Sequence, residues 1–377
     1  MSARILINAL SAKQGGIATF SSNLAYSFRE RGVNFRIAVS PALSHIPNAM
    51  VFQTSRFPPA RRLVWEQTVW RYYVCEWRAD LLFSSANFAL LSCPIPQVLL
   101  VREGGLFDPL YMDMIAPLLG KKAAIDRFFR RLLMRKSIQA SDRVLVPSET
   151  FKKQIAQYSP KIGRKIEVLR YGVPIKKFEA SKRRRWREDG FLKILYVSVY
   201  YVHKIPGDLV RAVEFLHAAG VPCRAYLTMD IDKIRETPGS DLDLSVIRRG
   251  MDAGLVDIGT VPYEKIPDLY AEHDIFVFSS MNETFGHPMA EAMAARIPIV
   301  AANTGVNREI LGDCARYYEP FAPEKLAAEI LAMDSFPLER ERMAELGSKR
   351  VGRSYSWNDY VDQLLTVFSD MTGKRNR

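Results

Sequence analysis

The chain has 377 residues and a formal net charge of +12, and this length suggests about two domains. Its content of 48% hydrophobic and 25% charged residues is typical of a globular protein and excludes disordered, collagen-like and low-complexity chains. The four cysteines form no CxxC pair, so we expect neither a disulfide scaffold nor a zinc ribbon. This cysteine usage is typical of a protein in a reducing compartment. Since no apolar window approaches about 18 residues, we expect no membrane-spanning helix.

The charge is distributed unevenly along the chain. Residues 1–180 carry 27 Lys/Arg and 12 Asp/Glu, whereas residues 191–377 carry 21 Lys/Arg and 27 Asp/Glu. A basic half followed by a mildly acidic half indicates two domains with different partners. A basic surface attracts phosphate, which nucleic acid, an anionic membrane or a phosphorylated substrate could supply. Composition alone does not choose among these three.

Short apolar runs alternate with helical patterns along the first half. A helix at Ala18–Arg31 follows the first strand and a Gly-Gly loop. We expect strands at Arg4–Ala9, Phe35–Ser40, Leu81–Ser84, Gln97–Val101, Arg143–Val146 and Lys165–Tyr171.

The second half repeats this alternation. A helix near Gly207–Ala219 follows its first strand. The expected strands are Lys193–Val199, Ala225–Met229, Val256–Gly259, Ile275–Ser279 and Pro298–Ala302. Strands alternating with helices predict parallel sheets, so two such sets predict an α/β protein with two Rossmann-like, doubly wound domains.

The domain boundaries follow from composition. Residues 1–180 form the expected first domain and residues 191–354 the second. Between them, residues 181–190 (SKRRRWREDG) are basic and polar without apolar periodicity, which predicts a linker. Residues 355–377 contain apolar residues at helical spacing over Tyr355–Met371, followed by a polar tail, and predict a C-terminal helix.

The densest chemical signal begins where the strand Ile275–Ser279 ends. Ligands of open α/β sheets lie beyond the carboxyl ends of the strands. Glu283 precedes a turn at Gly286, and Pro288 suits the first turn of a helix that runs to about Ala295. The start of that helix offers free amides to a phosphate. Glu291 lies on the same helix, so two carboxylates could face one pocket and accept hydrogen bonds from sugar hydroxyls; a helix-start glutamate and a solvated glutamate are the alternative.

The spacing of Glu283 and Glu291, with Phe285, Gly286 and Pro288 between them, resembles the E-x7-E signature of family 4 retaining glycosyltransferases. Other segments resemble the same family along nearly the whole chain, most closely from 193 to 320 and weakly from 40 to 130. These segments are Gly15-Gly16-Ile17, Val146-Pro147-Ser148, Val168–Pro174, Tyr196–Lys204, Gly259-Thr260-Val261, Leu269-Tyr270, and Asn303-Thr304-Gly305 with Glu309.

The resemblance implies a GT-B fold, in which two Rossmann-like domains face each other across a cleft and the C-terminal helix returns to the first domain. It implies a nucleotide-sugar donor, with a UDP, GDP or ADP group, and transfer that retains the anomeric configuration without a metal or other cofactor. Glu291 would hold the ribose, Glu283 would lie beside the donor sugar, and the Phe285-Gly286 amides would contact sugar and phosphate. Lys204 would neutralise the diphosphate. The amides of Gly15 and Gly16 would cap it from the first domain.

These roles agree with elementary charge arguments. Breaking a glycosyl–diphosphate bond places negative charge on the leaving group, which a lysine and fixed amides stabilise as it develops. A divalent ion would otherwise fill this role. Glycines allow close backbone approach to a ligand, although a solvated Lys204 and a simple turn at Gly15-Gly16 are the alternative interpretations.

Two positions depart from the family pattern. Many members carry an arginine five residues before the lysine, where this chain has Val199, so Arg102 or Arg308 could substitute. The first-domain histidine of many members is also absent from the comparable segment, which reads VLLVREGG over residues 98–105. There Arg102 and Glu103 stand at a strand end before two glycines, which indicates either a donor or acceptor contact or a structural turn.

Two basic, aromatic segments lie in the first half. Lys121–Lys136 combines apolar residues at helical spacing with basic ones, and Arg61–Arg78 carries three tryptophans among arginines. Such helices bind anionic membrane surfaces or lipid-linked acceptors; alternatively, they are domain helices whose apolar stripes face a sheet.

The favoured hypothesis is a metal-independent, retaining hexosyltransferase that extends a growing, lipid-linked glycan in the synthesis of cell-surface polysaccharide or lipopolysaccharide. It would act in the cytoplasm or on the inner face of the cytoplasmic membrane. The alternatives are an inactive GT-B scaffold and another GT-B enzyme such as a nucleotide-sugar epimerase or a phosphorylase-type transferase. A nucleic-acid partner is not expected, since no recognition motif is present. Metal binding by the DxD pairs Asp230/Asp232 and Asp241/Asp243 is not expected either, because their surroundings indicate loops.

Overall fold

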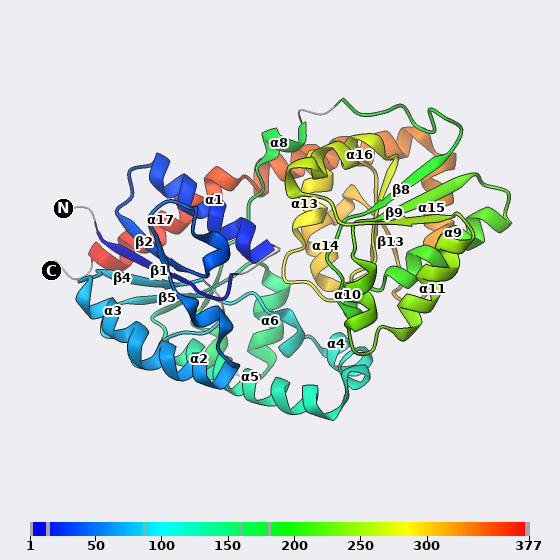
Figure 1. The fold of residues 1–377 in the computed structure, drawn as a ribbon. Helices are drawn as coiled ribbons and strands as arrows, with labels where there is room; N and C mark the ends of the chain where they lie inside the picture. The colour runs from blue at the N-terminus through cyan, green and yellow to red at the C-terminus, as the bar shows by residue number, and fades with distance from the viewer. Residues whose placement is uncertain (1–2, 13–15, 86, 159, 180–181, 374–377) are drawn as a thin grey trace. The chain divides into compact units, whose positions relative to one another are not determined.

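The computed structural model describes residues 3–12, 16–85, 87–158, 160–179 and 182–373. These residues form two compact units (Figure 1). The first unit is built from Met1–Phe107, Ile125–Arg170 and Asn358–Arg377, and the second from Asp108–Ala124 and Tyr171–Trp357. The polypeptide therefore passes between the units several times.

The first unit is organised around a parallel sheet with the strand order β3-β2-β1-β4-β5-β6-β7. Buried apolar runs form its central strands, as expected for a parallel sheet covered on both faces. The strands are β1 (Ile5–Ala9), β2 (Phe35–Val39), β3 (Ala49–Val51), β4 (Leu81–Ser84), β5 (Gln97–Leu100), β6 (Arg143–Val146) and β7 (Ile166–Val168).

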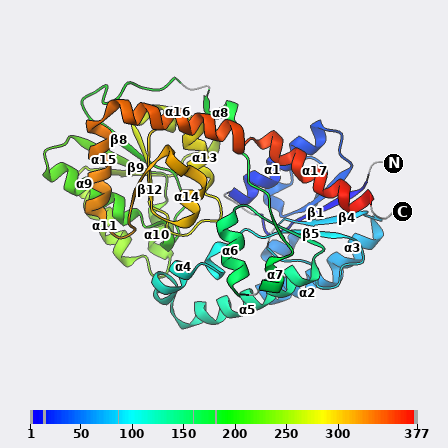
Figure 2. The same cartoon turned by 180° about the vertical axis from the view of Figure 1, so that it is seen from behind.

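One face of this sheet is covered by α2 (Pro59–Trp65), a π-helical turn (Glu66–Trp70), α3 (Arg71–Glu76), α5 (Gly120–Ala140), α6 (Glu149–Tyr158) and α7 (Pro160–Gly163). Ser84 of β4 pairs with Leu99 of β5, so Leu82 and Leu99 point to the same face. Leu82 packs in a core cluster with Trp70, and Leu99 packs in another with Met134 of α5. The helices α2, α3 and α5 therefore share one face, as Figure 2 also shows.

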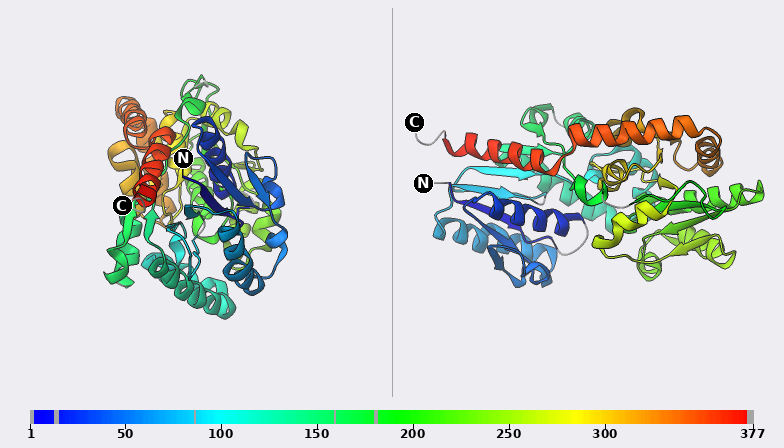
Figure 3. Two further views of the ribbon diagram at one scale, coloured as in Figure 1. Left: turned by 90° about the vertical axis from the view of Figure 1, so that its left-hand side faces the viewer. Right: turned by 90° about the horizontal axis from the view of Figure 1, so that it is seen from above.

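The opposite face is covered by α1 (Gly16–Glu30) and α17 (Trp357–Gly373). Phe368 of α17 lies 5.2 Å from the ring of Phe83 in β4 and 6.3 Å from that of Phe28 in α1, measured between ring centroids. In Figure 3 the red α17 runs alongside the blue elements of this unit. The expected return of the C-terminal helix to the first domain is thus confirmed, with the helix starting at Trp357.

The second unit contains the other parallel sheet, in the order β10-β9-β8-β11-β12-β13. Its strands are β8 (Leu192–Tyr196), β9 (Cys223–Leu227), β10 (Val256–Ile258), β11 (Ile275–Phe278), β12 (Ile299–Ala302) and β13 (Arg316–Tyr318). Its helices are α4 (Pro109–Met114), α8 (Ile175–Glu179), α9 (Pro206–Ala218), α10 (Ile231–Glu236), α11 (Asp241–Asp252), α12 (Ile266–Glu272), α13 (His287–Ala294), α14 (Gly305–Leu311), α15 (Pro323–Ser335) and α16 (Pro337–Ser354). Two Rossmann-like units confirm the expected α/β class.

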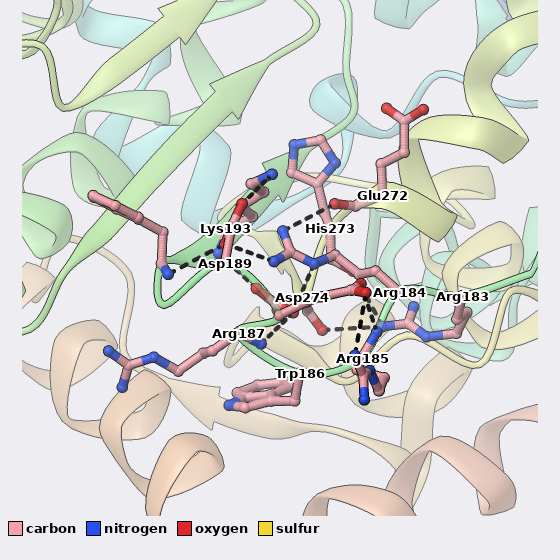
Figure 4. Close-up of polar contacts among 12 residues, drawn as sticks. Arg183, Arg184, Arg185, Trp186, Arg187, Asp189, Lys193, Glu272, His273 and Asp274 are labelled. Atoms are coloured by element: carbon pink, nitrogen blue, oxygen red, sulfur yellow. Dashed lines mark hydrogen bonds and ion pairs between the residues drawn. The ribbon is translucent and has the colours of Figure 1, made fainter.

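The segment expected as a linker, 181–190, lies within the second unit, and its described residues 182–190 are anchored there (Figure 4). The buried carboxylate of Asp274, just before β11, accepts hydrogen bonds from the backbone N–H groups of Arg187 (3.0 Å) and Lys193 (2.8 Å). The guanidinium of Arg184 lies 3.5 Å from the same carboxylate. Arg183 donates to three backbone carbonyls, those of Tyr270, His273 and Asp274. The charges that suggest a solvated linker therefore fix this segment to the unit, and the chain passes from the first unit to the second at residues 170 and 171 instead.

Candidate active site

The loop after β8 carries Lys204, the last residue of a 3-10 turn, η6 (Val202–Lys204). The backbone carbonyl of Lys204 accepts hydrogen bonds from the hydroxyl of Tyr196 (2.6 Å) and from Ser279 Oγ (2.8 Å). The next residue, Ile205, has a φ of 43°, a left-handed conformation that is costly for a β-branched side chain. Fixing the loop at the ends of β8 and β11 holds Lys204 in one place.

Lys204 and Glu283 form an ion pair between Nζ and Oε1. Their side chains are only 12% and 13% exposed, and the ammonium group lies 5.4 Å from the centroid of the Phe278 ring. Glu283, expected beside the donor sugar, and Lys204, expected at the diphosphate, are thus in contact in the second unit. An ammonium group has three donors, so Lys204 could meet an anionic ligand in this position.

Phe285 and Gly286 form the turn that leads into α13. Gly286 has a φ of 77°, and a Cβ at this position would lie 2.5 Å from Met289 Cε and 3.6 Å from Glu283 Cγ. Phe285 is buried, with its ring centroid 5.6 Å from that of Tyr171 and 5.3 Å from that of Tyr355. The turn is therefore closely packed, and its backbone requires glycine at 286.

Glu291 lies inside α13 and is 4% exposed. Its two carboxylate oxygens accept hydrogen bonds from the hydroxyls of Tyr263 (3.0 Å) and Tyr270 (3.4 Å). Burial raises its pKa to about 7, although the two tyrosines and Lys177 act in the opposite direction. Glu291 is thus hydrogen-bonded to tyrosines, whereas Glu283 pairs with Lys204, so the two glutamates of the pattern occupy different surroundings.

Tyr263, Tyr270 and Lys177 are members of this site that the sequence analysis did not assign to it. The Lys177 ammonium lies 4.1 Å from the centroid of the Tyr263 ring. Tyr270 falls within a segment similar to the family, but nothing in its spacing points to Glu291. Lys177 is 114 residues from Glu291 in the sequence, and no local pattern connects them.

A segment from the middle of the first half supports the Lys204 loop. Ile115, from the turn after α4, joins a buried cluster with Val202, Ile205 and Met281. The ring centroids of Tyr111 and His203 are 5.8 Å apart. Burial first, and then the neighbouring Lys204 charge, lowers the pKa of His203 well below its usual value. His203 therefore contributes a neutral, packed ring next to the lysine.

The remaining candidate residues lie in the first unit. Gly15 is outside the described residues. Gly16 begins α1 and is exposed; among described atoms, none lies within 4 Å of the place a Cβ would take, so packing does not require glycine at that position.

Arg102 and Glu103 follow β5. Glu103 accepts a hydrogen bond from Arg130 Nη2 at 2.6 Å, and the guanidinium of Arg102 lies 5.1 Å from the centroid of the Phe20 ring. The Arg102 backbone N–H donates to Asn87 Oδ1 at 2.8 Å. Contacts within the first unit thus hold this turn, and a ligand role for it remains a prediction.

The suggested substitutes for the missing arginine differ in their surroundings. Val199 itself is 48% exposed after β8. Arg308 stacks on the ring of Tyr317, 3.8 Å from its centroid, and donates to Asn303 Oδ1 at 2.6 Å. Arg308 is therefore held by its own neighbours in the second unit.

The DxD pairs have structural partners. Asp230 caps α10 by accepting hydrogen bonds from the backbone N–H groups of Asp232 and Lys233. Asp243 accepts hydrogen bonds from the Tyr200 hydroxyl (2.9 Å) and the Gly207 N–H (3.1 Å). Within the described residues, no group of three or more His, Cys, Asp or Glu side chains is placed to hold a metal ion.

Residues 247–350 match the family model described as "Glycosyl transferases group 1". The expected resemblance to group 1, family 4-like glycosyltransferases is therefore confirmed. The chain is 27% identical over 197 residues to the D-inositol 3-phosphate glycosyltransferase of Thermomonospora curvata, which covers 51% of the chain and 45% of that protein. It is 29% identical over 132 residues to the O-antigen chain mannosyltransferase B of Escherichia coli, which covers 34% of each. The aligned part thus spans less than half the length of either relative.

Solved structures share the fold over nearly the full length. Sucrose-phosphate synthase of Thermosynechococcus elongatus superimposes with a TM-score of 0.82 at 16% identity, covering 99% of this chain and 100% of that one. Anabaena Alr3699/HepE in complex with UDP and glucose gives a TM-score of 0.73 at 18% identity, with 98% and 100% covered. The expected GT-B fold is confirmed. At this identity the likeness concerns the fold alone.

Proposed function

We propose that the chain is a retaining, metal-independent glycosyltransferase that transfers a hexose-type sugar from a nucleotide diphosphate to a hydroxyl of a growing, lipid-linked glycan. One observation carries the proposal. The Lys204–Glu283 ion pair lies at the carboxyl ends of β8 and β11, beside the start of α13. Ligands of open parallel sheets bind at such strand ends, and a helix start favours phosphate.

The pair suits the charge changes of glycosyl transfer. The bond between the anomeric carbon and the diphosphate oxygen breaks, a bond to the acceptor oxygen forms, and the acceptor proton passes to the departing diphosphate. Lys204 would exchange its contact with Glu283 for the diphosphate and stabilise the negative charge that develops there. Glu283 would then face the sugar, on which positive charge develops. The absent first-domain histidine is not needed, since the leaving phosphate itself takes the proton.

The donor proposal draws on the site and on similar proteins. Glu291 is buried and accepts hydrogen bonds from the hydroxyls of Tyr263 and Tyr270. The donor's ribose would bind at this group of three residues. Anabaena Alr3699/HepE is solved in complex with UDP and glucose, and the Escherichia coli relative is an O-antigen chain mannosyltransferase. A relative from Mycobacterium tuberculosis, 26% identical over 248 residues, is a GDP-mannose-dependent alpha-mannosyltransferase. We therefore favour a UDP- or GDP-linked hexose over an ADP-linked one. The O-antigen relative also favours cell-surface polysaccharide or lipopolysaccharide as the product, which would place the enzyme at the inner face of the cytoplasmic membrane.

Thermal denaturation with a panel of UDP-, GDP- and ADP-sugars tests the donor. We expect one donor class to raise the denaturation temperature, with the increase unchanged in EDTA. An increase that EDTA abolishes would contradict metal independence. No increase with any donor would favour the inactive scaffold.

The Lys204→Ala variant tests the mechanism. Because the lysine acts on charge that develops during transfer, we expect turnover of the matching donor to fall by about 100-fold or more, with a smaller change in donor affinity. Donor hydrolysis and acceptor transfer would be measured beside Lys325→Ala, which removes an exposed lysine of α15 in the same unit. Wild-type turnover in Lys204→Ala would remove this residue from the mechanism.

A further inference from the structure

The long helix α5 turns its large apolar side chains to solvent. Ile125, Phe128, Phe129 and Leu132 are 60%, 65%, 60% and 42% exposed, and the two phenylalanine rings lie 5.6 Å apart. The sheet-facing side of α5 instead buries Met134, Ser137 and Ile138. The apolar stripe that could have faced the sheet therefore points outward, in a pattern opposite to that of an ordinary domain helix.

The neighbouring helices on the same face of the first unit add to this surface. Val64, Val69 and Tyr72 of the α2–α3 region are 63%, 39% and 63% exposed. The segment after β4 connects the two regions, because Gln67 Nε2 donates to the Ala89 carbonyl and the Arg130 guanidinium lies 5.7 Å from the Phe88 ring centroid. Figures 1 and 2 both show α2, α3 and α5 on one side of the sheet. We call the exposed apolar residues of α2–α3 and α5 the outer apolar surface.

Basic residues accompany this surface. Exposed lysines lie on the α5 helix at positions 121, 122 and 136, and exposed arginines lie in the α2–α3 region at 61, 71 and 78. Within residues 61–78 and 121–136, the exposed acidic residues are Glu76 and Asp126, and the Asp126 carboxylate lies 3.9 Å from the Arg130 guanidinium. The net charge of the surface is therefore positive.

We infer that the outer apolar surface docks on an anionic lipid bilayer, with Phe128 and Phe129 entering the boundary between headgroups and acyl chains. Outward aromatic and aliphatic side chains flanked by lysines and arginines are what such a surface binds. Contiguous exposed apolar residues indicate an interaction site on a soluble domain. A second copy of the chain fits less well, because pairing this face with itself would bring positive charges together. The inference deepens the proposed lipid-linked acceptor, but it concerns binding that needs neither donor nor acceptor.

Vesicle sedimentation of the full chain tests this inference. We expect binding to phosphatidylcholine vesicles that contain about 30% phosphatidylglycerol, little binding to phosphatidylcholine alone, and weaker binding at high salt. The double variant Phe128→Ser/Phe129→Ser should bind at least about tenfold more weakly. The control, Phe191→Ser/Phe336→Ser, removes two phenylalanines of the second unit that are 51% and 59% exposed, and should bind as the wild type does.

Replacing Lys121, Lys122 and Lys136 by glutamine separates the electrostatic part, and should reduce the salt dependence of binding. Equal binding by the wild type and the Phe128/Phe129 variant would overturn the inference. The inference would also be overturned if light scattering showed that the wild type is a dimer and the Phe128/Phe129 variant a monomer. In that case a second copy of the chain, not a bilayer, would cover the surface. Vesicle binding without donor-induced stabilisation would instead support the docking surface and contradict the proposed transferase.

Discussion

At the residue scale, Glu291 is the side chain whose chemistry is most altered by its surroundings. An exposed glutamate is ionised at neutral pH, but this one is enclosed by α13 and by the rings of Tyr263 and Tyr270. Both hydroxyls donate to it, which favours the charged form, yet burial outweighs them and leaves the pKa at about 7. The carboxyl is therefore neutral in the folded protein over a pH range in which it is ionised in the unfolded chain.

This difference predicts a pH-dependent stability. Between about pH 4.5 and 7 the folded protein holds a proton that the unfolded chain has lost, so stability falls as the pH rises through this range and levels off above it. The shift corresponds to about 3 kcal/mol. In the Glu291→Gln variant the side chain cannot ionise, and we expect that part of the decline to disappear.

Urea denaturation midpoints at pH 5 and pH 8 measure the effect. Glu324→Gln, which changes an exposed glutamate of α15, is the matched control and should retain the wild-type pH dependence. An identical decline in the Glu291→Gln protein would mean that this carboxyl does not carry the effect.

At the element scale, the segment after α8 shows how a buried acid organises a run of arginines. Asp274 binds the backbone at Arg187 and Lys193 and pairs with Arg184. Further along, the Trp186 indole N–H donates to Asp334 Oδ1 at 2.7 Å, and its ring stacks with the guanidinium of Arg340. A sequence rich in trypsin sites is thus folded against α12 and α15–α16.

We therefore expect trypsin to cut slowly after Arg183, Arg184 and Arg187 in the native protein. Asp274→Ala leaves the backbone N–H groups of Arg187 and Lys193 without their acceptor, at a cost of about 1–3 kcal/mol per buried group, so cleavage there should become faster. It also removes one of the two carboxylates that pair with Arg184, the other being Asp189. Mass spectrometry of the fragments identifies the sites. The control, Asp232→Ala, removes the partner of the exposed Arg235 and should leave the rate unchanged. Rapid cleavage of the wild type at these three sites would instead support the interpretation of this segment as a flexible linker.

The sequence predicts the elements that are long and apolar and misses those whose partners are remote. The central strands of both sheets follow from their apolar runs. The three-residue edge strands β7 and β10 fall within the expected strands Lys165–Tyr171 and Val256–Gly259, whereas β3 and β13, of the same length, were not expected. A run of three residues carries too little periodicity to be predicted consistently. The outward direction of α5 was equally hidden, since a helical pattern shows a stripe but not which way it faces. In the site, Lys204 and Glu283, which both follow strands, are singled out by the resemblance to the family, whereas Tyr263 and Lys177 come close to Glu291 only through the fold.

At the scale of the whole molecule, the first unit depends on a segment far along the chain. Phe20, Phe28 and Phe83 form one face of its core, and Tyr360 and Phe368 of α17 complete it. Phe368 is 2% exposed. A large aromatic side chain in such a position contributes through both buried area and packing.

Replacing Phe368 by alanine should destabilise the first unit by about 3–5 kcal/mol. Hydrogen exchange locates the effect: amides of β1 and β4 should exchange faster, while those of β8 and β11 in the second unit should not change. Phe336→Ala, which truncates a side chain that is 59% exposed, is the comparison and should leave both sets unaltered. Unchanged exchange in β1 and β4 of the Phe368→Ala protein would show that α17 is dispensable for this unit.

The placement of α17 also bears on how the protein is made. A ribosome has synthesised all the strands of the first unit by Val168, yet the helix that covers Phe28 and Phe83 begins 189 residues later, at Trp357. Domains otherwise tend to fold in order as they emerge. During translation the nascent first unit therefore carries an open aromatic face, which makes it a candidate client for chaperones and leaves prematurely terminated chains prone to aggregation.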